Sequence, residues 1–372
     1  MNSLCEILLT RPVSHIYVER DLLEEKNSRV ERILSQYASA QVIPIGHYKD
    51  VFCRTRQNID LQHRSQSLIL ARRTGRLLYP GSPVCQAFGE THFFYTSLCM
   101  NCIYDCQYCY LRGMYPSPNL VLFVNFEDYV REIDALLRDH PVYLCVSYDT
   151  DLCATESLHG YVAAFSELAR TRTGLTVEVR TKAACTPLLR QMEPCERLIF
   201  AFTLSPEEVV KMEEKTPSLT ARLQAVREAI DRGHPVRLCF DPMMLVPAWR
   251  TAYARLTDTL GEALGAERLR KVRDFSVGTF RISREYLPSL RRSTDCAAVQ
   301  YPFVLSEGFY QYQRTPQSLR DSSPFRGAKL HYTPLSPKNP HPFQPRAVYV
   351  VMQTGFGQTP RKAATGRAAI SS

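Results

Sequence analysis

The sequence predicts an α/β protein whose centre is a partly closed, parallel (β/α)6 barrel of the TIM type. Residues 91–285 alternate apolar, strand-like runs with helical patterns six times, which is typical of βα units in series. The 372 residues suit one such barrel with an appendage, or two modest domains. No run approaches the roughly 20 apolar residues of a membrane helix, and the chain start lacks a basic secretory segment, so we expect a cytoplasmic location without membrane attachment.

Each barrel strand is expected at an apolar run, and a helical pattern follows it. The expected strands are His92–Ser97, Val142–Tyr148, Thr176–Lys182, Leu198–Leu204, Val236–Pro242 and Asp274–Arg281, with an extra strand at Val121–Asn125. The expected helices are Glu127–Asp139, Glu156–Thr171, Thr186–Met192, Ser218–Arg232 and Thr251–Leu264. The fourth helix is the best marked, because Pro217 and Ser218 open it and Gly233 closes it. In such barrels the chemistry lies at the carboxyl ends of the strands.

Smaller regions flank the barrel. Residues 1–90 form a predicted α/β lead-in, residues 286–314 a hairpin-like region, and residues 315–372 a basic, Pro-rich tail that we expect to be mostly disordered. The lead-in contains one expected helix, Leu22–Tyr37, and the short strands Ile16–Val18, Gln41–Ile45, Leu68–Ala71 and Leu77–Tyr79. The net charge of +9 resides mainly in the tail, where nine Lys/Arg face one Asp from residue 313 onward. The total charge therefore does not establish a nucleic-acid groove on the barrel.

The cysteines carry the strongest chemical signal. An odd number, thirteen, spread over the chain is not typical of a disulfide framework. Three of them, Cys102, Cys106 and Cys109, are spaced C-x3-C-x2-C just after the first barrel strand. Three thiolates on one loop can bind three irons of a [4Fe–4S] cubane and leave the fourth iron open for a small molecule. The alternatives are a zinc site, because Cys99 also forms a C-x2-C pair with Cys102, and inert core thiols.

This loop resembles that of the radical S-adenosylmethionine (SAM) superfamily, and its Tyr108-Cys109-Tyr110-Leu111 run resembles the spore photoproduct lyase family. The resemblance extends over roughly residues 10–312. It implies a partial barrel of the radical SAM kind, a [4Fe–4S] cluster and SAM as cofactors, and a flavodoxin- or ferredoxin-like electron donor. It also implies a carbon–carbon lyase reaction in which a 5′-deoxyadenosyl radical removes a hydrogen atom from a thymine dimer in DNA.

The resemblance assigns roles to individual residues. Tyr108 and Tyr110 match two tyrosines that return the radical to SAM, although both could merely cover the cluster. Lys182 matches a lysine that holds the SAM carboxylate, which an ammonium group suits. Thr150 matches a SAM-contacting serine in one register, and Ser147 takes that place if the loop is shifted.

The hydrogen donor is the point of departure from the family. Where the family's lyases carry a cysteine after the second barrel strand, an ungapped alignment puts Tyr148. Cys145 lies three residues earlier, and strand alternation would place it, with Ser147, on the face opposite Tyr148. Cys145, Tyr148 and Cys153 therefore remain alternative donors, and an inert Cys145 remains possible on the same grounds.

The substrate is left open by these residues. The region Tyr301–Tyr312 resembles the start of a hairpin that helps the family's lyases take lesion bases out of the duplex. The tail could contact phosphates, could be a solvated extension, or could differ from the family terminus through a shifted reading frame. Other polar residues near strand ends could bind substrate or form structural ion pairs: Asp149, Asp151, Arg180, Asp241 and Arg281, with Glu213 and Arg222 on the SAM or substrate side. The two leading hypotheses are a spore photoproduct lyase and a relative acting on a different substrate.

Overall fold

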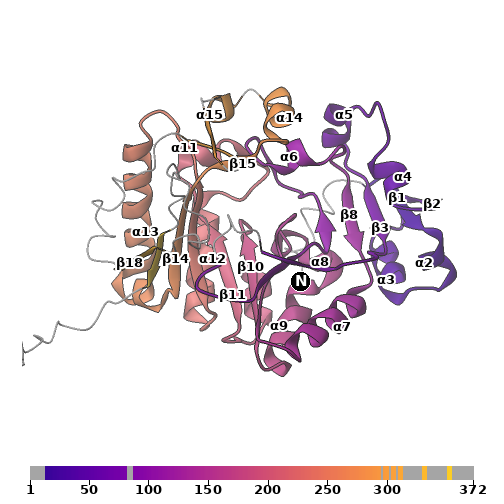
Figure 1. The fold of residues 1–372 in the computed structure, drawn as a ribbon, viewed down its shortest axis with the longest axis horizontal. Helices are drawn as coiled ribbons and strands as arrows, with labels where there is room; N and C mark the ends of the chain where they lie inside the picture. The colour runs from indigo at the N-terminus through magenta and orange to yellow at the C-terminus, as the bar shows by residue number, and fades with distance from the viewer. Residues whose placement is uncertain are drawn as a thin grey trace, which may run out of the picture.

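Six parallel strands form the centre of the fold and lie in the sheet in the order of the sequence. In the computed structural model, which describes residues 13–81, 87–294 and 296–300 and, further on, strands alone, the sheet curves into a partial barrel (Figure 1). The six strands are β5 (Phe93–Thr96), β9 (Val142–Cys145), β10 (Leu175–Thr181), β11 (Leu198–Thr203), β13 (Val236–Met243) and β14 (Asp274–Thr279). All neighbours among them pair in parallel, which confirms the predicted fold class.

Helices cover the outer face of this sheet. They are α7 (Phe126–Leu137), α8 (Glu156–His159), α9 (Tyr161–Thr171), α10 (Thr186–Gln191), α12 (Leu219–Asp231) and α13 (Trp249–Lys271). Ser218 caps α12 by accepting the N–H of Ala221, as its sequence position predicts. The single helix expected over Glu156–Thr171 was wrong, because Gly160 adopts φ 73° and separates α8 from α9. Helix α13 is longer than expected and kinks at Gly265.

A second, five-stranded sheet adjoins the barrel at its amino-terminal side. Its order is β2 (Gln41–Ile45), β1 (His15–Glu19), β3 (Leu68–Ala71), β8 (Leu120–Phe123) and β6 (Cys99–Met100). The expected extra strand is thus β8, and it pairs with the lead-in rather than with the barrel. The prediction of one continuous lead-in helix over Leu22–Tyr37 was wrong. This segment is two helices, α2 (Arg20–Glu24) and α3 (Ser28–Gln36), because Lys26 is left-handed and Asn27 caps α3 through its side chain.

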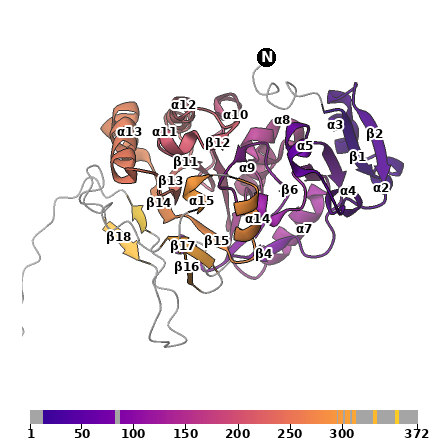
Figure 2. The same ribbon diagram turned by 90° about the horizontal axis from the view of Figure 1, so that it is seen from above.

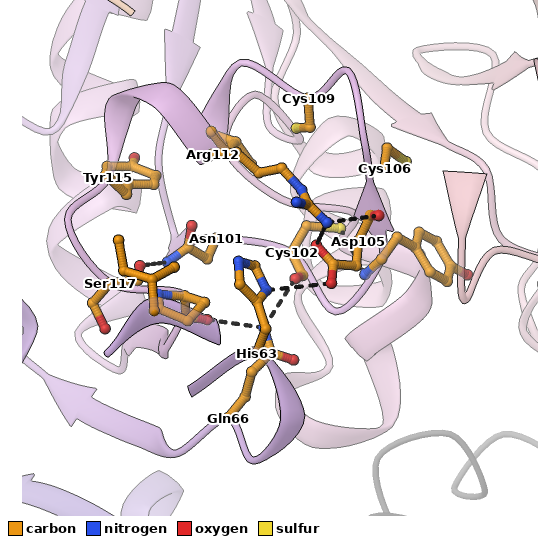
Figure 3. Close-up of a pocket in the computed structure, with 14 residues that line it drawn as sticks. His63, Gln66, Asn101, Cys102, Asp105, Cys106, Cys109, Arg112, Tyr115 and Ser117 are labelled. Atoms are coloured by element: carbon orange, nitrogen blue, oxygen red, sulfur yellow. Dashed lines mark hydrogen bonds and ion pairs between the residues drawn. The ribbon is translucent and has the colours of Figure 1, made fainter. Parts of the chain in front are cut away.

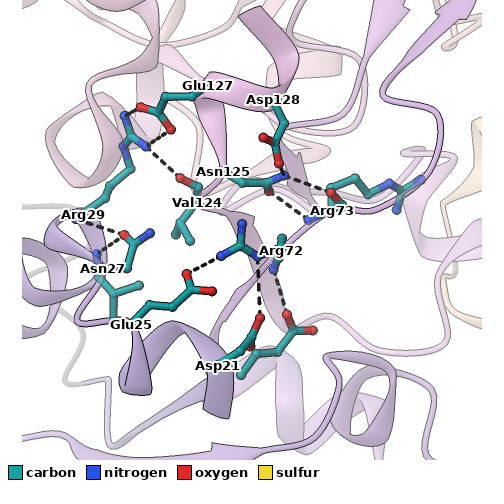
Figure 4. Close-up of polar contacts among 12 residues, drawn as sticks. Asp21, Glu25, Asn27, Arg29, Arg72, Arg73, Val124, Asn125, Glu127 and Asp128 are labelled. Atoms are coloured by element: carbon teal, nitrogen blue, oxygen red, sulfur yellow. Dashed lines mark hydrogen bonds and ion pairs between the residues drawn. The ribbon is translucent and has the colours of Figure 1, made fainter. Parts of the chain in front are cut away.

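Ion pairs and amide contacts attach the lead-in to the barrel helices (Figure 4). Arg29 of α3 binds the carboxylate of Glu127 at 2.9 Å and the carbonyl of Val124 at 2.7 Å. Asn125 accepts the N–H of Arg73 and donates to its carbonyl, both at 2.9 Å. These contacts fix the chain just after β8 to the lead-in.

Short elements complete the described chain. They are α4 (Lys49–Phe52), α5 (Ile59–Arg64), β4 (Leu78–Pro80), β7 (Asp105–Cys106), α6 (Leu111–Met114), the 3-10 turn Cys153–Thr155, α11 (Glu207–Val210), β12 (Glu213–Glu214), α14 (Leu287–Arg292) and α15 (Ala297–Gln300). The view from above shows α14 and α15 beside the strand group β15–β17 (Figure 2). No helix in the described ranges has the length and apolar character needed to cross a membrane.

The carboxyl-terminal region adds strands to two sheets. The expected hairpin is present as β16 (Phe303–Ser306) and β17 (Phe309–Tyr312), which pair antiparallel and continue to β15 (Arg281–Ser283). Two strands of the basic tail, β18 (Lys329–Tyr332) and β19 (Val350–Gln353), extend the barrel sheet beyond β14. The rest of the tail, with its predicted disorder, lies outside the described residues. The domain division likewise stays a prediction.

Candidate active site

The loop with the three spaced cysteines is held in place by polar contacts of its own residues. Asn101 opens it in a left-handed conformation, and its amide donates to the carbonyls of Ser117 and Asn119 at 2.6 and 2.8 Å. Strand β7 within the loop pairs antiparallel with β12, so that Cys106 lies opposite Glu213. The loop is therefore held at its start by contacts to the segment just before β8 and at Cys106 by the pairing of β7 with β12.

Asp105 is the third anchor of this loop. Its carboxylate pairs with Arg112 at 2.5 Å and with the His63 ring at 3.3 Å (Figure 3). It also pairs with Lys215 at 3.2 Å. Burial alone would raise the pKa of Asp105, but His63, Arg112 and Lys215 outweigh it and hold this pKa below its usual value. The side chain between Cys102 and Cys106 is thus an ionised tether rather than a ligand.

The three thiols of this loop are free and line one shared cavity. Cys102, Cys106 and Cys109 carry no disulfide, and all three border both a small pocket (Figure 3) and the main cavity of about 790 Å³. Burial raises the pKa of each thiol, that of Cys106 to about 12, so the thiols lose their protons only when a metal replaces them. Among the described residues no three His, Cys, Asp or Glu side chains surround a single ion. Three thiols around a shared space fit a [4Fe–4S] cubane, because each thiolate there binds a separate iron.

The main cavity opens at the carboxyl ends of the barrel strands, where barrel chemistry is expected. Every strand of the parallel series contributes a residue to its wall within two residues of its end: Tyr95, Cys145, Lys182, Thr203, Asp241 and Thr279. The other cavity walls include the loop tyrosines and Arg281–Ser283. The site predicted from strand order is therefore a real cavity of the molecule.

Lys182 is a charged residue of this wall that directly contacts one of the thiols. Its ammonium donates to the hydroxyl of Tyr108 at 2.8 Å, and it lies 3.1 Å from the Glu213 carboxylate and 3.8 Å from the Cys106 sulfur. Burial would lower the pKa of Lys182, but Cys106, Glu213 and Tyr108 beside it raise this pKa well above its usual value. The Lys182 side chain therefore stays positively charged beside the three cysteine thiols.

Glu213 contacts this lysine and is itself held by Arg222. Arg222 is fully buried and pairs with Glu213 at 2.6 Å, and Ser205 donates to the same carboxylate at 2.9 Å. Burial would raise the pKa of Glu213, but Lys182 and Arg222 lower it to about 2. The sequence placed both residues on this side of the site, and the structure joins them to the predicted SAM-binding lysine.

The two loop tyrosines make different hydrogen bonds. Tyr108 donates to Glu213, whereas Tyr110 donates to the Tyr148 carbonyl at 2.6 Å and to Asp149 at 3.2 Å. Asp149 is buried and also accepts Ser97. Burial raises the pKa of Asp149, although the hydroxyls of Ser97, Tyr115 and Tyr110 oppose that effect. Tyr110 thus connects the cysteine loop with the end of the second barrel strand.

The residues after that strand do not separate onto two faces as alternation predicted. Strand β9 ends at Cys145, so the chain beyond it is no longer pleated, and Cys145, Ser147, Tyr148 and Thr150 all line the main cavity. The ring of Tyr148 stacks on Tyr95 with centroids 4.5 Å apart. The hydroxyl of Ser147 is buried and has no hydrogen-bond partner among the described residues.

Sequence reasoning did not single out two other groups of residues in the cavity wall. Tyr104, within the cysteine loop, borders both the small pocket and the main cavity. Arg73, Tyr79 and Tyr95, from the lead-in and the first barrel strand, form a further wall. The position of Tyr104 between two of the spaced cysteines was a usable signal, whereas the tertiary fold alone brings Arg73 to the site.

Comparisons with known proteins agree with this geometry. The family model described as spore photoproduct lyase matches residues 92–285. A mutant spore photoproduct lyase with bound AdoMet and dinucleoside spore photoproduct matches with a TM-score of 0.70 at 16% identity, covering 85% of this chain and 98% of that chain. A spore photoproduct lyase complexed with dinucleoside spore photoproduct matches with a TM-score of 0.70 at 15% identity and the same coverage.

No curated protein matches the chain. At 15–16% identity the solved structures show a shared fold. The family model, by contrast, spans more than half of the chain, and it covers the cysteine loop, Lys182 and all six barrel strands. This chain belongs to the spore photoproduct lyase family of radical SAM enzymes.

Proposed function

We propose that this protein binds a [4Fe–4S] cluster through Cys102, Cys106 and Cys109 and repairs the spore photoproduct thymine dimer in DNA. The observation that carries the proposal is the convergence of three free thiols and the Lys182 ammonium on one cavity at the carboxyl ends of the barrel strands. A cluster held by these thiols would supply the electron for reductive cleavage of SAM, and the radical formed from SAM would remove a hydrogen atom from the substrate.

The chain's own residues bind and orient SAM. Lys182 is a partly buried cation whose present partners, Tyr108 and Glu213, can share it with an incoming carboxylate. Ser147 offers a buried hydroxyl without a described partner, which a polar group of SAM would satisfy. Thr150 borders the same cavity and is the alternative contact. Each of these groups is preformed, so binding requires little rearrangement.

Hydrogen return is the second task of the site. Tyr108 and Tyr110 lie on either side of Cys109 and line the cavity, which suits a hydrogen-atom relay between SAM and the substrate. Cys145 and Tyr148 both border the cavity from the end of β9 and are the two donor candidates. Cys153 is buried and is not among the residues that line the main cavity.

The cavity wall has the chemistry of a nucleotide site. Its volume of about 790 Å³ accommodates SAM together with a dinucleotide-sized lesion. Tyr95 and Tyr148 offer aromatic surface for bases, and Arg73 and Arg180 offer positive charge for phosphates. We place the enzyme in the cytoplasm, where DNA and a flavodoxin- or ferredoxin-like electron donor are both accessible.

One observation favours a second candidate, a family member that acts on a different substrate. Tyr148 stands where the ungapped alignment expects the donor cysteine of the family's lyases, and its ring is stacked against Tyr95. A changed donor would alter the fate of the product radical. The cluster, SAM and the barrel would stay the same.

An anaerobic turnover assay tests the proposal. The reconstituted enzyme receives SAM, dithionite and a spore-photoproduct dinucleotide, and thymine product and 5′-deoxyadenosine are quantified together. Repaired thymine is the expected result, and 5′-deoxyadenosine without repair would favour the second candidate.

A matched pair of variants controls for the metal site. Cys109→Ala removes a proposed ligand. The variant should no longer bind iron in a fixed stoichiometry, and it should form neither thymine nor 5′-deoxyadenosine. Cys195→Ala removes a buried thiol that does not line the main cavity and should retain both. Formation of neither product by a wild-type enzyme with an intact cluster would contradict the proposal.

A further inference from the structure

Tyr104 occupies the centre of the cysteine loop, two residues from Cys102 and two from Cys106. Its side chain is almost completely buried, with the residue only 5% exposed. Its backbone N–H donates to the Cys102 sulfur at 3.4 Å. The residue borders both the main cavity and the small pocket, as do all three cysteines. Tyr104 thus shares both the small pocket and the main cavity with the three thiols.

The hydroxyl of Tyr104 differs from those of other buried tyrosines near the site. It is buried and has no hydrogen-bond partner among the residues that the structure describes. The buried tyrosines 108, 129, 143 and 161 each donate to a protein acceptor: Glu213, the Ser97 carbonyl, Glu178 and the Phe123 carbonyl. An unpartnered buried hydroxyl has lost its hydrogen bond to water without a replacement, so a ligand that accepts from it would recover that loss.

The nearby carboxylate of Asp151 does not need this hydroxyl. It already accepts the Thr181 hydroxyl at 2.8 Å and the backbone N–H of Lys182 and Ala154 at 2.7 and 3.1 Å. The residues that border both the small pocket and the main cavity together with Tyr104 are Tyr115 and the three cysteines, whose thiols are the proposed cluster ligands. An acceptor bound by Cys102, whose sulfur accepts the backbone N–H of Tyr104, would lie close to the Tyr104 side chain.

We propose that the Tyr104 hydroxyl donates a hydrogen bond to a sulfur of the cluster held by Cys102, Cys106 and Cys109. The inference rests on the proposed function, because it requires that cluster. Tyr104 is then a positioning residue that tunes the cluster. A hydrogen bond to a cluster sulfur stabilises the reduced, more negative form, so it raises the reduction potential.

The variant Tyr104→Phe removes one oxygen and keeps the ring. In the metal-free protein it should leave the melting temperature unchanged or raise it, because the hydroxyl is unpartnered there. In the cluster-loaded protein, a redox titration followed by electron paramagnetic resonance should give a more negative midpoint potential than in the wild type. SAM affinity should change by less than about two-fold.

Tyr129→Phe is the matched control. Tyr129 is fully buried on α7, its hydroxyl donates to the Ser97 carbonyl at 3.0 Å, and it does not line the main cavity. Its removal should lower the melting temperature of both the metal-free and the loaded protein and leave the midpoint potential unchanged. The two variants therefore separate loss of a packed hydroxyl from loss of a cluster contact.

Two results would overturn the inference while leaving the proposed function standing. The first is an unchanged midpoint potential in a loaded Tyr104→Phe enzyme. The second is weakened SAM binding with an unchanged potential, which would assign the hydroxyl to SAM. A wild-type protein that assembles no cluster would instead refute the proposed function, and the inference with it.

Discussion

Lys182 and Tyr108 are joined by a hydrogen bond of 2.8 Å between the ammonium nitrogen and the phenol oxygen, and both also contact Glu213. The lysine comes from the end of the third barrel strand, β10, and the tyrosine from the cysteine loop. This contact therefore connects the proposed SAM-binding cation with the proposed cluster-binding loop. It makes the position of one dependent on the other.

Lys182→Met should lower SAM affinity by about 10-fold or more, because a charge-assisted hydrogen bond contributes roughly 1.5–3 kcal/mol. Anaerobic calorimetric titration of the cluster-loaded enzyme with SAM measures this. Lys271→Met, which removes an exposed lysine paired with Glu267 on α13, should leave the affinity unchanged. Equal SAM affinity in Lys182→Met and the wild type would refute the assigned role.

Tyr110→Phe should uncouple SAM cleavage from product formation, because it removes the phenolic hydrogen from the proposed relay. The expected result is more 5′-deoxyadenosine per repaired lesion than in the wild type, measured by chromatography of both products. Tyr115→Phe is the control, because Tyr115 also bonds to Asp149 but lies outside the cysteine run. A wild-type ratio in Tyr110→Phe would show that the tyrosine only packs against the site.

Sequence reasoning identified the fold because the barrel strands are buried on both faces and so appear as continuous apolar runs. All six residues of Leu198–Thr203 are buried, for example, and the chain order equals the sheet order. The helix break at Gly160 was missed because an isolated glycine is tolerated in many helices. The pairing of β8 with the lead-in was also missed, since only tertiary structure decides which sheet an extra strand joins.

The candidate site was predictable where spacing along one loop determines proximity. Cys102, Cys106 and Cys109 lie within eight residues, so their shared cavity follows from local chain geometry. The face assignment of Cys145 and Tyr148 failed because β9 ends three residues earlier than its apolar run suggested. Arg73 was missed because it is far from the cysteine loop in the sequence, and only the tertiary fold brings it into the same cavity wall.

Cys145→Ala should abolish correct hydrogen return while SAM cleavage continues, since a thiol gives up a hydrogen atom more readily than a phenol. The measurable result is a changed product in place of two thymines, detected by mass spectrometry. Cys239→Ala, which removes a buried thiol on β13 that does not line the main cavity, should give normal product. Normal product from Cys145→Ala and altered product from Tyr148→Phe would assign the donor to Tyr148 instead.

His159 and Glu156, neither of which lines the main cavity, form a buried pair 3.4 Å apart whose pKa values shift in opposite directions. Burial, with the neighbouring charges of Arg32 and Arg29, lowers the pKa of His159 to about 3. Its ring nitrogen accepts the N–H of Tyr161 at 3.0 Å, as a neutral imidazole does. Burial raises the pKa of Glu156 to about 7, although hydrogen bonds from backbone N–H groups to its carboxylate oppose the shift.

The signs of the two contributions to stability follow from proton counts. Below pH 6.5 the unfolded chain protonates His159 and the folded protein does not, so this residue lowers the free energy of unfolding as the pH falls toward 3. Between pH 4.5 and 7 the folded protein keeps a proton on Glu156 that the unfolded chain releases, so this residue lowers the free energy of unfolding as the pH rises. The two effects cancel between pH 4.5 and 6.5.

His159→Gln removes one half of this compensation and keeps a donor and an acceptor. The free energy of unfolding of the variant, relative to the wild type, should increase as the pH falls from 6.5 to 4.5, with a slope of at most about 1.4 kcal/mol per pH unit. Glu156→Gln should show the opposite slope. Urea unfolding of both variants and the wild type at several pH values measures the differences, in which all other titrating groups cancel. A pH-independent difference for both variants would mean that neither residue changes its proton affinity on folding.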